Sequence, residues 1–271
     1  MNRIAQQSNF YSKVIRFKFI KALQWRTEMI LWILLDIFPF IILLFIWQSV
    51  LSLSASPSIS LPELTVFYYL VILVQGFTVT HFEEYRPEEI RMGKIDFFLI
   101  KPYSFIQEII LNDIAGKLLY ILMISPFLAL LGYILWHLGL FAIPALTTIH
   151  VLVFVCLLLL AYILQFCLSL LITMTAFWFE EAQGLSNLKI LVISLFSGTL
   201  IPFALLPEWL QKVTNAQPLK FLFAVPIRLI QEQALPTAQD WSMLFGTLAF
   251  LIGTIFLLWQ RGIQKYSSAG G

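Results

Sequence analysis

Charged side chains are scarce in this sequence. Only 12% of its 271 residues are Asp, Glu, Lys or Arg, whereas 60% are hydrophobic. Soluble domains are about 25% charged and about 45–50% apolar, so a soluble fold cannot bury this much apolar surface. The composition excludes a soluble globular protein. It predicts an all-α, polytopic membrane protein in which residues 1–271 form a single transmembrane domain.

Sequence motifs for catalysis are also absent. The pairs Gly93–Lys94 and Gly116–Lys117 lack the earlier glycine of a Walker A phosphate loop and the Ser or Thr that follows its lysine. The histidines form no His-Glu-x-x-His pair, and there is no Gly-x-Ser-x-Gly motif. We therefore expect a transport protein rather than an enzyme, with no catalytic residue, metal site or cofactor of its own.

Cysteine is nearly absent as well. Cys156 and Cys167 lie in one apolar run. On a helix this spacing separates them by roughly 16 Å, beyond the ~7 Å that a disulfide can bridge between Cα atoms. We expect both to be packing residues.

What the sequence does have is six hydrophobic runs, each near the ~20 residues that a membrane helix needs. The predicted spans are residues 29–51, 64–82, 118–137, 147–179, 188–206 and 241–260. The fourth run is long for a single crossing, so we expect that helix to tilt or to protrude.

The N-terminal segment, residues 1–28, places basic residues among aromatic and aliphatic ones. This mixture predicts a helix that lies at the membrane surface. The alternative is a positively charged flank that only fixes the orientation of the first span.

The orientation follows from the Lys and Arg residues. Only three of the 17, Lys212, Lys220 and Arg228, fall in the segments on one side of the predicted membrane. The positive-inside rule therefore places both termini, and the loop of residues 83–107, in the cytoplasm. We expect the protein to lie in the cell (inner or plasma) membrane.

The loop of residues 83–107 is the densest cluster of mixed charge in the chain. Pro87 suits a first helical position, Glu88 and Glu89 suit a first turn, and Gly93 can end a helix in a left-handed turn. These signals predict a short, surface-exposed helix over Pro87–Met92.

The second half of the loop is apolar at its centre. Lys94 and Lys101 flank a run of apolar residues that Pro102 ends, and four consecutive apolar residues outside the bilayer favour a partner or the lipid surface. Ser104 with Gln107 predicts a capping box that starts the helix into the third span.

The stretch after the fifth span, residues 207–236, is interrupted by prolines. We expect Pro207 to begin a helix through Lys212, and Pro218–Gln233 to form a second piece broken at Pro226. Backbone broken at membrane depth is tolerated only where protein or a water-filled cavity covers it. The alternative is an ordinary proline-rich outer loop.

Few polar groups lie within the predicted spans. They are Asp36, Gln75, Thr78, Gln165, Ser169, Thr173 and Thr175. An acid at the centre of a membrane helix costs ~2.5–3.5 kcal/mol, so Asp36 is a candidate polar site. It can pair with a basic residue near the inner face, line an interface between two subunits, or line a transport pathway.

The segment IRMGKIDFFLIKPYS resembles the cytoplasmic loop of the ABC-2 type permease family, in the branch of six-span exporter subunits of unassigned substrate. The matching residues are Gly93, Asp96, Leu99, Lys101 and Pro102. The prolines after the fifth span resemble the family's helical elbow, which caps the pathway. Its residues here are Pro202, Pro207, Trp209, Pro218 and Pro226.

This resemblance implies a coupling helix that docks on a separate ATP-binding subunit, which carries the ATP and Mg. The implied coupling residues are Arg86, Pro87, Glu88, Glu89, Arg91, Gly93, Asp96, Phe97, Leu99, Lys101 and Pro102. It also implies a second permease subunit, identical or a sister chain, and export of a hydrophobic or amphipathic substrate. Nucleic acid is not an expected partner.

The alternative function is an ion- or proton-coupled secondary transporter without an ATPase. That class predicts internal repeats and several acids at the membrane midplane. The sequence offers one such acid, Asp36, and no internal repeat.

Overall fold

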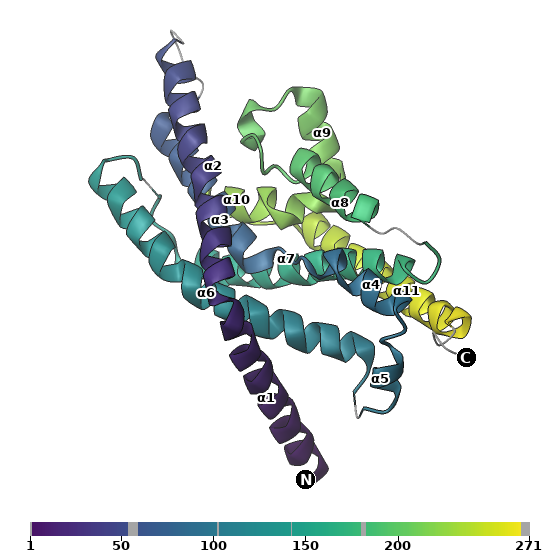
Figure 1. The fold of residues 1–271 in the computed structure, drawn as a ribbon. Coiled ribbons are helices and arrows are strands. Elements are labelled where there is room, and N and C mark those ends of the chain that lie inside the picture. The colour runs from purple at the N-terminus through teal and green to yellow at the C-terminus, as the bar shows by residue number, and fades with distance from the viewer. Residues whose placement is uncertain (1, 54–58, 102, 142, 180–182, 267–271) are drawn as a thin grey trace.

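The computed structural model describes residues 2–53, 59–101, 103–141, 143–179 and 183–266 (Figure 1). Every element in these ranges is helical. The α-helices are α1 (Asn2–Ala22), α2 (Arg26–Ser52), α3 (Leu61–Thr78), α4 (Arg86–Arg91), α5 (Asp96–Leu99), α6 (Phe105–His137), α7 (Thr148–Thr175), α8 (Gln183–Phe196), α9 (Glu208–Ala216), α10 (Ala224–Gln231) and α11 (Ala238–Lys265). The 3-10 turns are η1 (Leu23–Trp25), η2 (Phe82–Glu84), η3 (Phe203–Leu205) and η4 (Pro218–Leu222).

Five described helices are long and apolar enough to cross a membrane, namely α2, α3, α6, α7 and α11. The prediction of an all-α, polytopic membrane protein is therefore confirmed. Helix α3 lies at the centre of the bundle and packs against α2, α6, α7 and α10. In the apolar stretch of α3, 56% of the residues are buried inside the protein, whereas the figure is 11% for the helical segment that contains α2.

The predicted fifth span, residues 188–206, is wrong at both ends. Helix α8 is an apolar helix of only 14 residues that ends at Phe196. The chain then turns at Gly198, whose φ of +82° belongs to the left-handed region that favours glycine. A Cβ at Gly198 would lie 3.0 Å from the Ala224 Cβ, so the close approach of α10 also requires glycine here.

Two other predicted spans end earlier than expected. Helix α3 ends at Thr78 rather than Phe82, and α7 ends at Thr175 rather than Phe179. Residues 176–178 after α7 form a turn, and residues 79–81 after α3 lead into the 3-10 turn η2. Hydropathy extends past α7 because residues 176–179 are apolar, and past α3 because Val79 and Phe82 are apolar.

The N-terminal segment is helical, as predicted, but it is not isolated. Helix α1 passes through the 3-10 turn η1 into α2, so Ser12–Ser52 forms one helical segment (Figure 1). Helix α1 also packs along α6. Its position at the membrane surface stays a prediction.

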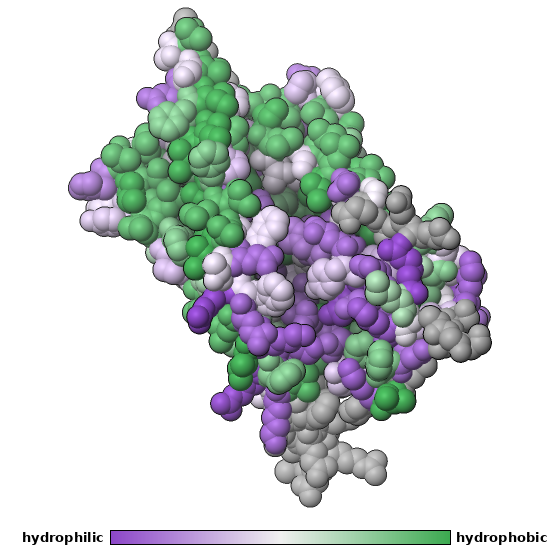
Figure 2. All heavy atoms as spheres, in the orientation of Figure 1, coloured by the Kyte–Doolittle hydropathy of each residue, from purple (hydrophilic) through white to green (hydrophobic). Residues whose placement is uncertain are grey.

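The surface of the molecule is divided by polarity. In Figure 2 hydrophobic side chains cover the upper part, where α2 lies, and hydrophilic side chains gather lower down, around α1 and α4. We call the end that carries residues 83–107 the loop face, and the end that carries residues 207–236 the elbow face.

Candidate functional site

The loop face begins with η2 and the short helix α4. Pro87 lies in the first turn of α4, together with Glu88 and Glu89, and Gly93 has a φ of +74°. Ser104 and Gln107 form a reciprocal capping box at the start of α6, with N···O distances of 2.9 and 3.3 Å. These local predictions are confirmed.

Helix α4 is not fully exposed, so that part of the prediction is wrong. One face buries Arg86, Pro87 and Ile90, because α4 packs against α7. The buried Arg86 guanidinium donates to Glu89 at 2.5 Å. A charge that loses water needs such a partner.

The second half of the loop presents apolar side chains outward. Phe97 is 63% exposed and Ile100 is 86% exposed. Phe98 turns inward against Phe105, with ring centroids 5.4 Å apart, and the Lys101 ammonium lies 4.3 Å from the Phe98 ring centroid. The Leu99 side chain and Pro102, both predicted coupling residues, lie outside the described part of the structure.

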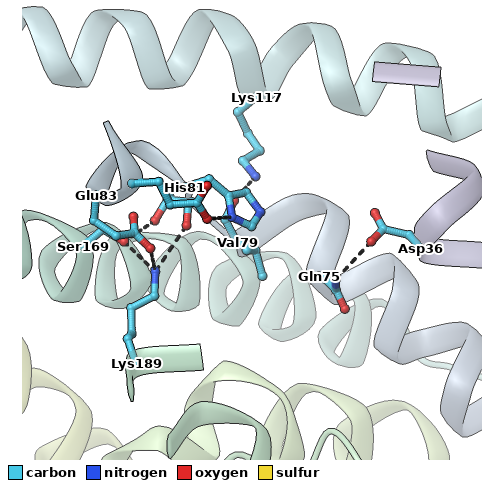
Figure 3. Close-up of polar contacts among 10 residues, drawn as sticks. Asp36, Gln75, Val79, His81, Glu83, Lys117, Ser169 and Lys189 are labelled. Carbon is cyan, nitrogen blue, oxygen red and sulfur yellow. Dashed lines mark hydrogen bonds and ion pairs between the residues drawn. The ribbon is translucent and has the colours of Figure 1, made fainter. Parts of the chain in front are cut away.

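A buried ion pair links the loop to the bundle. Lys189 of α8 pairs with Glu83 of η2, and their side chains are only 6% and 1% exposed (Figure 3). The Lys189 ammonium also donates to Ser169 Oγ at 2.9 Å and to the Thr80 carbonyl at 3.3 Å. The loop is therefore fastened to α8 and α7 by a desolvated, hydrogen-bonded charge pair.

Other polar contacts surround this pair. Lys117 of α6 donates to the Val79 carbonyl, and Lys18 of α1 pairs with Glu108 of α6. On the exposed side of η2 a hydrogen bond from His81 lowers the pKa of Glu84. These contacts join α1, α3 and α6 at the loop face.

A cavity of about 310 Å³ opens beside the ion pair, between α2, α3 and α8. Asp36 lies in its wall and accepts hydrogen bonds from the Gln75 amide at 3.2 Å and from the Tyr120 hydroxyl. In Figure 3 the Asp36 and Gln75 side chains point toward each other. Both of these donors are neutral, and the basic residues Lys117 and His81 act on Asp36 only through electrostatics.

The short helices of the elbow face pack against the bundle. Pro202 precedes η3 and Pro207 caps α9, which extends past Lys212 to Ala216. The predicted break at Pro226 is wrong: the chain bends at Phe223 (φ −140°, ψ −55°), and Pro226 lies in the first turn of α10, where its missing N–H is tolerated. Trp209 is 66% exposed, as an interface residue would be.

The elbow is part of the core. Its buried side chains include Phe221, Leu222, Phe223, Ile227, Leu229 and Ile230. They pack against α3, α7 and α11, and the Lys220 ammonium pairs with Asp240 at 2.7 Å. Protein covers this broken backbone, and this is the condition under which backbone of this kind is tolerated at membrane depth.

A comparison with known protein families identifies the family of this chain. The profile described as ABC-2 family transporter protein matches residues 33–270. The chain belongs to the ABC-2 transporter family. No curated protein and no solved structure matches the chain. The protein is therefore a membrane permease subunit of an ABC transporter, and a transport subunit rather than a catalytic one.

In this ABC-2 permease the matched residues include the loop, the cavity and the elbow. The sequence indicated Asp36 and the local turns of the loop. It did not indicate the Glu83–Lys189 pair, although a single basic residue in the apolar helix α8 is a signal that could have found it. The partner could not be found, because the pair joins residues 106 positions apart.

Proposed function

We propose that this ABC-2 permease subunit drives export with ATP that a separate ATP-binding subunit hydrolyses. The observation that carries the proposal is the Glu83–Lys189 pair. It joins the loop, whose outer surface is free for a partner, to α8, which lines the cavity. A displacement of the loop would reach the cavity wall through this contact.

The docking surface of the loop is α5 with its flanking residues. Phe97 and Ile100 expose apolar side chains beside Lys94 and Lys101. Apolar residues surrounded by charge are typical of protein interfaces. We propose that the ATP-binding subunit, with its ATP and Mg, covers this surface, and that the loop face and both termini lie in the cytoplasm of the cell.

A second permease subunit, identical or a sister chain, completes the pathway in this proposal. Helix α2 exposes most of its apolar side chains, and the cavity opens between α2 and α8 at the edge of the bundle. A partner that packs along this edge would enclose the cavity, and lipid would cover the remaining apolar surface.

Affinity purification from native membranes tests this proposal. We expect the tagged chain to copurify with a polypeptide that contains a Walker A motif, and we expect the purified complex to hydrolyse ATP in the presence of Mg. Gly93→Ala with Asp96→Asn should lose this polypeptide, because a Cβ at φ +74° distorts the loop. Val213→Gln on the elbow face is the control and should retain it. Retention of the polypeptide by the loop variant would overturn the docking assignment, whereas substrate transport without any ATPase would favour the secondary transporter.

Cysteine labelling tests the orientation. In a background with Cys156→Ala and Cys167→Ala, we expect Arg91→Cys to react with a membrane-impermeant maleimide only after the cells are opened. Lys212→Cys should react from outside. The reverse pattern would invert the proposed topology.

A further inference from the structure

The cavity between α2, α3 and α8 carries two hydrogen-bond acceptors that the fold leaves available. We propose that it binds the protonated amine of an amphipathic substrate. This inference rests on the proposed transport function and names the substrate class that the cavity takes.

Gln165 supplies the first acceptor. This residue of α7 is 3% exposed and lines the cavity, and its Oε1 atom has no hydrogen-bond partner among the described residues. A buried acceptor without a donor is unfavourable, so such an atom is satisfied in the functional state. A ligand that donates an N–H bond satisfies it.

Asp36 supplies the second acceptor and the charge. Gln75 and Tyr120 each donate one hydrogen bond to its carboxylate, which offers about four acceptor positions. Both donors are neutral, so they orient the carboxylate without forming an ion pair with it; Lys117 and His81 act on Asp36 only through longer-range electrostatics. A cation that enters the cavity forms that ion pair.

The basic residues nearby are engaged elsewhere. Lys189 also lines the cavity, but its ammonium pairs with Glu83. Lys117 donates to the Val79 carbonyl and is not part of the cavity wall (Figure 3). His81 does line the cavity, but its ring contacts Glu84 at 3.3 Å. The cavity therefore favours a positive ligand over a negative one.

The remaining wall suits an apolar body. The apolar lining includes Leu35, Leu43, Val71, Ile72, Ile190 and Ile193. Along α3 the polar Gln75 is nearer the loop face, whereas Tyr68 and Val71 are nearer the elbow face. A ligand with a charged end and an apolar end matches this division, and the volume of about 310 Å³ is at the lower end of ligand pockets.

Binding to the purified full-length chain together with its ATP-binding subunit tests the proposal. The probes are a dansyl-labelled primary alkylamine, its trimethylammonium analogue and its uncharged N-acetyl amide. We expect the primary amine to bind about tenfold or more tightly than the amide, because a charge-assisted hydrogen bond is stronger than a neutral one. Equal affinities for the amine and the amide would overturn the proposal.

Variants separate the two acceptors. Asp36→Asn should weaken both cationic probes about tenfold or more, because it removes the negative charge. Gln165→Leu should weaken the primary amine but leave the trimethylammonium probe unchanged, since that probe has no N–H group. Asp113→Asn is the matched control: this acid is held by Tyr162 at 2.6 Å, is not part of the cavity wall, and should leave binding unchanged.

The outcomes distinguish this inference from the proposed function. The inference would be overturned if Asp113→Asn lost as much amine binding as Asp36→Asn. It would also be overturned if Asp36→Asn bound the amine with unchanged affinity while its size-exclusion profile matched that of the parent. Selective amine binding by a chain that copurifies with no ATP-binding subunit would support the inference while removing the proposed ATP-driven mechanism.

Discussion

The loop and the elbow both consist of short helices between apolar ones, but they are held in different ways. The elbow buries a cluster of aromatic and aliphatic side chains between α3, α7 and α11. The loop is fastened to the bundle by the buried Glu83–Lys189 pair and by a few buried apolar side chains, such as Ile90 and Ile95, and turns Phe97 and Ile100 outward. The elbow lies largely inside the core, whereas the loop has one buried side and one exposed side.

This difference separates two mechanical roles. Close-packed apolar contacts spread over many atoms resist displacement as a unit. A buried ion pair concentrates the connection in one contact whose partners move together. We expect changes in the elbow to lower the stability of the whole bundle, and changes in the outer loop to leave stability intact while they disconnect the partner.

The largest effect should come from Lys189→Met. It leaves the Glu83 carboxylate buried without its cation, and breaking a buried pair from one side costs about 3–5 kcal/mol. Thermal unfolding of the detergent-solubilised chain measures the loss. The double variant with Glu83→Gln should recover a large part of it, and a double variant as unstable as the single one would contradict the role of the pair.

Leu222→Ala in the elbow should follow, with a loss of about 2–5 kcal/mol, since Leu222 is 1% exposed and the change leaves a cavity. The same unfolding measurement applies. No second substitution in the loop should rescue this variant. An unfolding midpoint equal to that of the parent would show that the elbow is not part of the core.

Ser104→Ala should lower stability by about 1 kcal/mol. It removes the side-chain oxygen that accepts a hydrogen bond from the Gln107 backbone N–H at the start of α6. Hydrogen exchange of the amides in the first turn of α6 detects the local fraying. Ser104→Asp, which restores an acceptor, should bring the protection back.

The smallest effect on stability should come from Ile100→Gln. Ile100 is 86% exposed, so the change should alter stability by less than about 0.5 kcal/mol. It should nevertheless reduce the amount of ATP-binding subunit that copurifies. Val213→Gln, at a 41% exposed apolar residue of α9, controls for the loss of an apolar side chain. Equal copurification by both variants would remove α5 from the proposed interface.

The sequence predicted the features that depend on neighbouring residues. The capping box of Ser104 and the left-handed turn at Gly93 follow from short-range hydrogen bonding and backbone geometry. The end of α8 did not follow, because it depends on the approach of Ala224 to Gly198. The break at Phe223 was assigned to Pro226 because a proline can either interrupt a helix or begin one.

The candidate site was predictable only in part. Asp36 stands out as an acid in an apolar run, but its neutral partners Gln75 and Tyr120 come from two other helices. The pairing of Glu83 with Lys189 depends on how η2 meets α8, and hydropathy carries no information about that contact.

The Glu83–Lys189 pair also imposes an order on biogenesis. Glu83 leaves the ribosome 106 residues before its cation. At about 5–20 residues per second, the carboxylate spends roughly 5–20 s without that partner while α6 and α7 insert. Because a lone buried carboxylate is unfavourable, we expect η2 to remain in water during this interval and Glu83 to be buried only when α8 supplies its cation.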